Sequence, residues 1–378
     1  MGFMTKSAGR GAGFPLIVMP LVVVVALGTA GCGRLVSSGA STTIVTGSTT
    51  TSPTGQLPDP SRRSTDPDTT PVTTYEIAPT ATSASLSGPS SPDLAAVDTA
   101  VPSNGELLVF LPGTDGHPDC CQYLLETAAR TGFLAVGLTY DNTEAVGEIC
   151  LDDLSCYTTV RQDDFDGSTP SSFTDITPAN SIQSRLVDLL QYLAAAHPSQ
   201  GWGSFLAGST PVWSKIVVAG HSQGGGDAAY IAKIRAVEGV VMLSSDVDST
   251  ATRPPVAATY LTTGHLIPLD RYIGFDHAAD PFNDKIETDW TALDLQSFGP
   301  AVSVDGKRPP FGNSHELLTS AAVPPGPAPA LATHDSTAVD VQTPLCADGL
   351  PAFVPVWRYM MEVAGGLPIT SGRPVCTG

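Results

Sequence analysis

The sequence predicts an α/β protein with a doubly wound, mostly parallel sheet and helices on both faces. From residue 105 onward, short apolar runs alternate with segments whose apolar residues recur at helical spacing. This alternation is typical of parallel strands that are buried on both faces and joined by helices. In addition, the glycine-rich stretch GHSQGGG at 220–226 joins one apolar run directly to the next helical segment.

The elements follow in order along the chain. The apolar runs predict strands at 106–113, 133–140, 215–220, 239–245, 271–277 and 315–322. The intervening patterns predict helices at 118–132, 179–198, 224–237 and 351–365. A first edge strand is also expected within 73–86, in the segment TTYEIAPTATSASL.

The N-terminal segment has the features of an export signal. Lys6 and Arg10 precede an apolar run from Phe14 to Ala30, and TAGC follows, ending at Cys32. Small residues before a cysteine resemble a bacterial lipobox, which implies a signal peptide over 1–31 and a lipid on Cys32. We therefore expect an anchor on the outer face of the bacterial cell membrane, or a secreted protein if Cys32 is unmodified.

A low-complexity segment follows the signal. Ser, Thr, Pro and Gly dominate residues 33–100, and such a composition buries too little surface to offset its ordering entropy. We expect a flexible tether over 32–75, or extending to residue 100, and a catalytic domain over 76–378.

The charge balance excludes some partners. Acidic residues outnumber basic ones 37 to 18, and the isoelectric point is near 4.5. Nucleic-acid binding needs a basic face, so no nucleic-acid partner is expected.

The cysteines support export to an oxidising compartment. Once Cys32 carries lipid, an even number remains. We expect Cys150 to pair with Cys156, and Cys346 with Cys376. Cys120 and Cys121 are left as a vicinal bridge or two free thiols. No metal site is expected, because there is no CxxC pair and the histidines do not cluster at ligand spacing.

The glycine-rich junction predicts a nucleophile. Ser222 stands at the carboxyl end of an expected parallel strand, where a sharp turn into a helix would display it at the edge of the sheet. In such a turn, Gly220 and Gly224 avoid clashes that a larger residue would cause. Gly225 and Gly226 would let the helix approach the sheet closely.

This Gly-His-Ser-Gln-Gly arrangement, with a strand before it and a helix after it, resembles the nucleophile elbow of the α/β-hydrolase family. The resemblance covers about residues 105–365. FLPGTDG at 110–116 and PVWRYM at 355–360 also resemble exported bacterial hydrolases of the esterase and lipase kind. The likeness implies a sheet of the α/β-hydrolase type.

The resemblance implies an oxyanion hole made from two backbone N–H groups. One belongs to Gln223, the residue after the nucleophile. The other belongs to the loop at 111–118, where Thr114 is favoured and Asp115 is next.

The resemblance also implies a histidine after the last strand, which takes the proton of Ser222 and later protonates the leaving group. His334 stands between the last expected strand and the final helix. His315 precedes that strand, and His277 ends the previous one, so both remain as alternatives. His221 is expected to be a packing or pocket residue.

The family order is serine, acid, histidine. Asp280 follows the strand at 271–277 by a few residues and is favoured as the acid. Asp246 and Asp248 follow the preceding strand, and Asp276 lies nearer the strand end, so these three remain as alternatives.

These residues predict a serine hydrolase that cleaves a small-molecule or lipid ester through an acyl-enzyme, without a cofactor. A serine nucleophile disfavours the aspartate-based branches of the family. A thioesterase, acyltransferase or peptidase would use the same residues. An inactive hydrolase-fold lipoprotein for binding or adhesion is the alternative of a different class.

Overall fold

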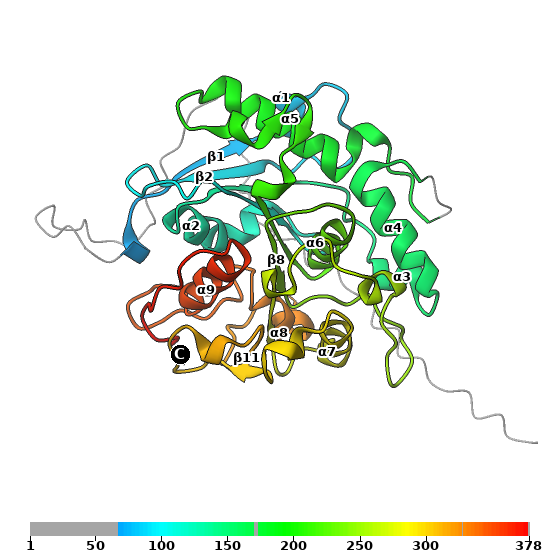
Figure 1. Ribbon diagram of the computed structural model, residues 1–378, viewed down its shortest axis with the longest axis vertical. Coiled ribbons are helices and arrows are strands. Elements are labelled where there is room, and N and C mark those ends of the chain that lie inside the picture. The colour runs from blue at the N-terminus through cyan, green and yellow to red at the C-terminus, as the bar shows by residue number, and fades with distance from the viewer. Residues whose placement is uncertain (1–66, 170–172, 327, 377–378) are drawn as a thin grey trace, which may run out of the picture.

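The computed structural model describes residues 67–169, 173–326 and 328–376. Its centre is a nine-stranded sheet with the order β1-β2-β4-β3-β7-β8-β9-β11-β10 (Figure 1). The strands are β1 (Thr73–Ile77), β2 (Asp93–Val97), β3 (Leu107–Leu111), β4 (Leu134–Gly137), β7 (Ile216–His221), β8 (Gly239–Leu243), β9 (Tyr272–His277), β10 (Val302–Ser303) and β11 (Glu316–Thr319). A separate small hairpin pairs β5 (Leu206–Ala207) with β6 (Thr210–Pro211).

The sheet is mostly parallel. From β4 across to β10 every neighbouring pair is parallel, whereas β1 and β2 add an antiparallel edge. The parallel strands β3, β4, β7, β8 and β9 are buried along their whole length, as strands covered on both faces must be. The predicted fold class is therefore confirmed.

Helices cover the two faces of this sheet (Figure 1). One face packs against α2 (Gln122–Arg130) and α9 (Val354–Ala364), which also contact each other. The other face packs against α4 (Leu154–Asp166), α5 (Ile182–Ala196), α6 (Gln223–Ile234) and α7 (Asn283–Ala292). The short helices are α1 (Pro79–Thr82), α3 (Val146–Cys150) and α8 (Ala332–Asp335).

The folded domain begins earlier than a tether to residue 100 would allow, because residues 73–97 supply β1 and β2. Sequence patterns missed β2, a five-residue strand between Ser- and Pro-rich stretches.

The expected signal peptide, Cys32 and most of the expected tether lie outside the described residues. Within the described ranges, no helix is both long and apolar enough to span a membrane.

Two of the helical regions that the sequence did not predict bury charged side chains. No helix was predicted for residues 141–175, but α3 and α4 occupy much of this stretch. The buried face of α4 includes Arg161, Asp163 and Asp164, and that of α7 includes Asp289. Buried charges interrupt the apolar periodicity by which a helix is found in a sequence.

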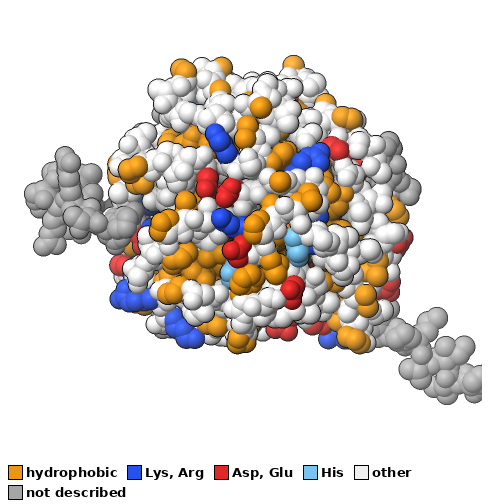
Figure 2. Space-filling model, viewed as in Figure 1, with side chains coloured by type: hydrophobic (Ala, Val, Ile, Leu, Met, Phe, Trp, Pro, Cys, Tyr) orange, Lys and Arg blue, Asp and Glu red, His pale blue; other side chains and the backbone are white. Residues whose placement is uncertain are grey.

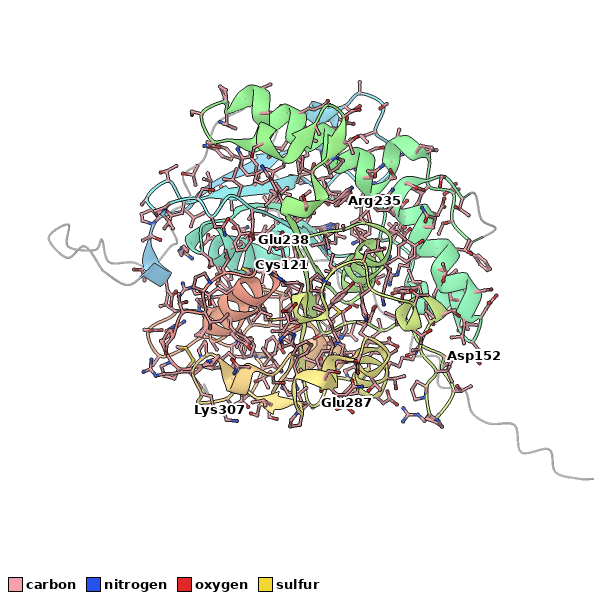
Figure 3. All side chains as sticks on the ribbon, in the orientation of Figure 1. Cys121, Asp152, Arg235, Glu238, Glu287 and Lys307 are labelled. Carbon is pink, nitrogen blue, oxygen red and sulfur yellow. A yellow bond between two sulfur atoms is a disulfide. The ribbon has the colours of Figure 1, made fainter. Side chains whose placement is uncertain are left out.

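The cysteine pairing is confirmed in two places and wrong in one. Cys150 bonds to Cys156, and Cys346 bonds to Cys376. Cys121 is a free, buried thiol that lies well inside the molecule (Figure 3). Because Cys121 is free, Cys120 and Cys121 do not form a vicinal bridge.

Few charged side chains are visible on the face of the molecule shown in Figure 2. Acidic and basic side chains are scattered singly or in small groups among apolar and neutral ones, with no extended basic patch.

Candidate active site

Ser222 lies in a strained turn between β7 and α6. Its backbone has φ +52° and ψ −120°, a conformation that L-residues rarely adopt. A Cβ on Gly220 would come within 2.0 Å of the Gly224 carbonyl oxygen, and one on Gly224 within 2.1 Å of the Leu111 carbonyl oxygen. The turn therefore requires glycine at both positions, for the reason expected from the sequence.

The next two glycines make room for specific side chains. A Cβ on Gly225 would lie 2.0 Å from Ser245 Oγ, just beyond β8. A Cβ on Gly226 would lie 2.1 Å from Nη2 of Arg161, which comes from α4. Gly225 thus meets the expectation of a close approach to the sheet, whereas Gly226 accommodates an arginine that the sequence did not reveal.

The loop after β3 lies directly against Ser222. A Cβ built on Gly113 would be 3.0 Å from Ser222 Cβ. The next residue, Thr114, donates its hydroxyl to Gln223 Oε1 at 2.8 Å. Among the described residues, no acceptor bonds the backbone N–H of Thr114 or of Gln223, whereas the N–H of Asp115 donates to the Asn142 carbonyl at 3.0 Å. Thr114 and Gln223 therefore offer the two unused donors.

Sequence patterns missed a side chain that holds this loop. Asn142 donates from Nδ2 to the Gly113 carbonyl at 2.5 Å and to the Gly116 carbonyl at 3.0 Å. Tyr140 donates its hydroxyl to the Pro112 carbonyl at 2.8 Å. Both residues follow β4, the parallel neighbour of β3, so their place at a strand's carboxyl end was the available signal.

His334 and Asp280 form a buried pair. Asp280 lies in the turn after β9, and His334 lies in α8, after β11. His334 Nδ1 and Asp280 Oδ2 are 2.7 Å apart, and the residues are 3% and 6% exposed. The other carboxylate oxygen, Oδ1, accepts the backbone N–H of Phe282 at 2.7 Å.

The pair shifts both pKa values in the direction of an ion pair. Burial alone would lower the pKa of His334, but the charge and hydrogen bond of Asp280 outweigh it and raise the pKa to about 9. Burial likewise opposes ionisation of Asp280, but His334 and several hydrogen bonds hold its pKa below the usual value. The carboxylate is thus suited to stabilise a protonated imidazole.

The alternative acids lie elsewhere. Asp248 is bound by Arg161, with Nε to Oδ2 at 2.9 Å and Nη2 to Oδ1 at 2.8 Å. Asp246 accepts a hydrogen bond from the Tyr260 hydroxyl at 3.3 Å. Neither carboxylate is bonded to His334.

Asp276 is closer to the pair but does not replace Asp280. It accepts a hydrogen bond from Asn283 Nδ2 at 3.1 Å. Burial and the neighbouring Asp280 raise the pKa of Asp276 well above the usual value, which disfavours its ionised form.

The other histidines have separate partners. His315 stacks on Phe298 and bonds the Tyr272 carbonyl through Nδ1 at 2.6 Å, at the opposite end of the sheet. His277 bonds the Ala321 carbonyl at 3.1 Å. His221 bonds the His334 carbonyl through Nε2 at 3.1 Å.

His221 contacts the backbone of His334 and has a neutral ring. Burial, followed by the nearby charge of His334, lowers the pKa of His221 to about 3, so its ring is neutral. A neutral ring that carries its proton on Nε2 donates it to the His334 carbonyl.

A cavity of about 480 Å³ brings these groups together. Ser222, Gln223, Thr114 and His334 all line it. Much of the remaining wall is apolar, and includes Val146, Val247, Pro281, Phe282, Leu331, Val339 and Val341. In the part of the chain that the structure covers, no group of three or more acidic, His or Cys residues could hold a metal ion.

Comparisons with known proteins add little. No protein-family model matches the chain, and no curated protein matches it. Among solved structures, one described as "Putative Dienelactone Hydrolase from Klebsiella pneumoniae subsp. pneumoniae MGH 78578" is similar, with 12% identity and a TM-score of 0.33. The match covers 65% of this chain and 84% of that one, and is too distant to assign a function.

Proposed function

We propose that this protein is a serine hydrolase of the α/β-hydrolase superfamily that cleaves carboxylic esters through an acyl-enzyme on Ser222. The observation that carries the proposal is the His334–Asp280 hydrogen bond of 2.7 Å, in a cavity that also contains a serine on a strained strand-to-helix turn. A nucleophile, a base and an acid that orients the base are the parts this chemistry needs.

In the proposed reaction, Ser222 Oγ forms a bond to the ester carbonyl carbon while His334 Nε2 takes the hydroxyl proton. The carbonyl oxygen becomes negative and accepts hydrogen bonds from the N–H groups of Thr114 and Gln223. The carbon–oxygen bond to the alcohol then breaks, and His334 passes the proton to the leaving alcohol. A water molecule, activated by the same histidine, attacks the acyl-enzyme and frees Ser222.

The cavity wall supports an apolar acyl group as the substrate. Side chains from the 145–147 segment, from Val247 and from the 281–282 and 330–341 segments surround the nucleophile with carbon atoms. A hydrophobic acyl chain placed there would leave water and bury apolar surface.

A fluorophosphonate probe tests the proposal, because it forms a covalent adduct only with an activated serine. We expect the wild-type protein to be labelled on Ser222 and to hydrolyse nitrophenyl esters. Ser222→Ala should fold normally, remain unlabelled and lose about 10⁴-fold or more in rate. An unlabelled wild-type protein would favour an inactive, ligand-binding relative of these enzymes.

A series of nitrophenyl esters and thioesters of graded acyl length then defines the substrate. The apolar wall supports faster hydrolysis of medium acyl chains than of acetate. A preference for thioesters or for peptides would indicate a thioesterase or a peptidase instead of an esterase.

Anchoring through Cys32 is part of the proposal and is supported by the TAGC junction. Mass spectrometry of the mature N-terminus should find a lipid on Cys32. An unmodified N-terminus would instead indicate a secreted enzyme.

A further inference from the structure

Helix α4 buries charge where most helices bury apolar side chains. Arg161 is 0% exposed and Asp164 is 3% exposed, on a helix that packs against α6 and α5. A buried arginine is costly unless its donors are matched by acceptors. Its partners therefore indicate what it does.

The guanidinium group of Arg161 has three partners, and all lie around the nucleophile turn. Nε and Nη2 donate to the two carboxylate oxygens of Asp248, at 2.9 and 2.8 Å. Nη1 donates to the backbone carbonyl of Gln223 at 2.8 Å and lies 3.1 Å from Asp227 Oδ2. Arg161 thereby joins α4, the first turn of α6 and the segment after β8.

The turn is shaped to receive this side chain. Gly226 is the position at which a Cβ would lie 2.1 Å from Nη2 of Arg161 and 2.8 Å from Asp246 Oδ1. The last glycine of GHSQGGG is thus needed for the arginine, and not for the serine itself.

We propose that Arg161 is a positioning residue of the hydrolase, which holds Gln223 so that its N–H faces the developing oxyanion. This inference rests on the proposed function. The carbonyl that Arg161 binds and the N–H that would bind the oxyanion belong to the same residue. The Gln223 carbonyl lies in the peptide bond to Gly224, and its N–H lies in the peptide bond to Ser222. Because Arg161 fixes the first peptide bond, rotation of the second is limited, so the N–H donor is in place before the reaction begins.

Lysine is the informative replacement. It keeps one positive charge beside Asp227 and Asp248, but it lacks the planar fork that bonds Asp248 and Gln223 at once. Asp248→Asn is a second, milder variant, because it keeps the shape of the side chain and removes the charge that orients the guanidinium.

Arg185 provides a matched control. It is a buried arginine on α5, 2% exposed, and donates to the backbone carbonyls of Asn180 and Ser87. Arg185 does not line the active-site cavity. Arg185→Lys therefore reports the cost of disturbing a buried guanidinium away from Ser222.

The experiment measures fluorophosphonate labelling, kcat, KM and thermal unfolding of the full chain. Arg161→Lys should slow labelling and lower kcat by about 10- to 100-fold, less than the loss of a whole oxyanion donor, with KM changed by less than about threefold. Asp248→Asn should lower both rates by about three- to tenfold. Both Arg→Lys variants should lower Tm, but Arg185→Lys should keep the wild-type rates.

A folded Arg161→Lys protein with wild-type labelling and kcat would overturn the inference while leaving the proposed function intact. If Arg161→Lys does not fold, Asp248→Asn decides, and wild-type rates in that variant overturn the inference. A fall in Tm with equal rate losses in Arg161→Lys and Arg185→Lys would make the role of Arg161 purely structural. An unlabelled wild-type protein would overturn the proposed function and this inference together.

Discussion

In the proposed hydrolase, His334 determines the pH range in which Ser222 can be activated. Only the unprotonated imidazole can accept the serine proton, and Asp280 raises the pKa of His334 to about 9. The base form therefore becomes more abundant as the pH rises above the usual histidine range.

We expect kcat/KM to increase with pH through an apparent pKa above 6.5, the usual value for a histidine. Asp280→Asn removes the charge that holds the proton on His334, so the midpoint should move to lower pH while the maximal rate falls. A pH–rate profile of both proteins on one soluble ester checks this. An unchanged midpoint in Asp280→Asn would mean that another carboxylate orients the base.

At the scale of elements, the turn between β7 and α6 fits tightly against the loop after β3. The parallel register pairs Gly220 with Leu111, so the two strand ends lie side by side. Gly224 is close to both the Leu111 and the Pro112 carbonyl oxygens. The same contact that requires glycine therefore brings the loop after β3 to Ser222.

Gly224→Ala should separate the turn from the loop. Its Cβ would lie 2.1 Å from the Leu111 oxygen, so the backbone must shift, which costs about 1–3 kcal/mol of stability. We expect a lower Tm and at least a tenfold loss of kcat, measured by thermal unfolding and ester hydrolysis.

Gly264→Ala is the control for this substitution. No atom lies within 4 Å of its built Cβ, and its backbone needs no positive φ. It should match wild type in both measurements. Full activity in Gly224→Ala would contradict the close fit of turn and loop.

At the scale of the whole molecule, the Cys346–Cys376 bond closes the C-terminal part of the chain around α9. It spans 30 residues, whereas Cys150–Cys156 spans six. A longer closed loop restricts the unfolded chain more, so the longer bridge should contribute more stability.

Replacing Cys346 and Cys376 by serine should cost about 3–4 kcal/mol of unfolding free energy, against about 2 kcal/mol for the same change at Cys150 and Cys156. Urea unfolding of the two double variants compares them. Because Cys346 and Cys376 do not line the cavity, kcat of the folded protein should stay at the wild-type value. A larger loss of unfolding free energy on removing the Cys150–Cys156 bond would show that contacts in the folded state matter more than the entropy of the unfolded chain.

The features that the sequence predicted correctly are encoded in neighbouring residues. The alternation of apolar runs and amphipathic segments, the glycines around Ser222 and the Cys150–Cys156 pairing all depend on local spacing. The parallel sheet and the turn could therefore be stated before the structure was known, whereas the order of Ser222, Asp280 and His334 was an expectation taken from the family resemblance.

Other features depend on contacts between distant segments, so only the tertiary structure decided them. Asp280, which bonds His334, is 54 residues from it, and Asp248 is bonded instead to Arg161, 87 residues away. Asn142 holds the oxyanion loop from a neighbouring strand end, and α4 was missed because its buried face is charged. Each depends on which partner a buried polar group finds in the folded chain, and local periodicity carries no information about that choice.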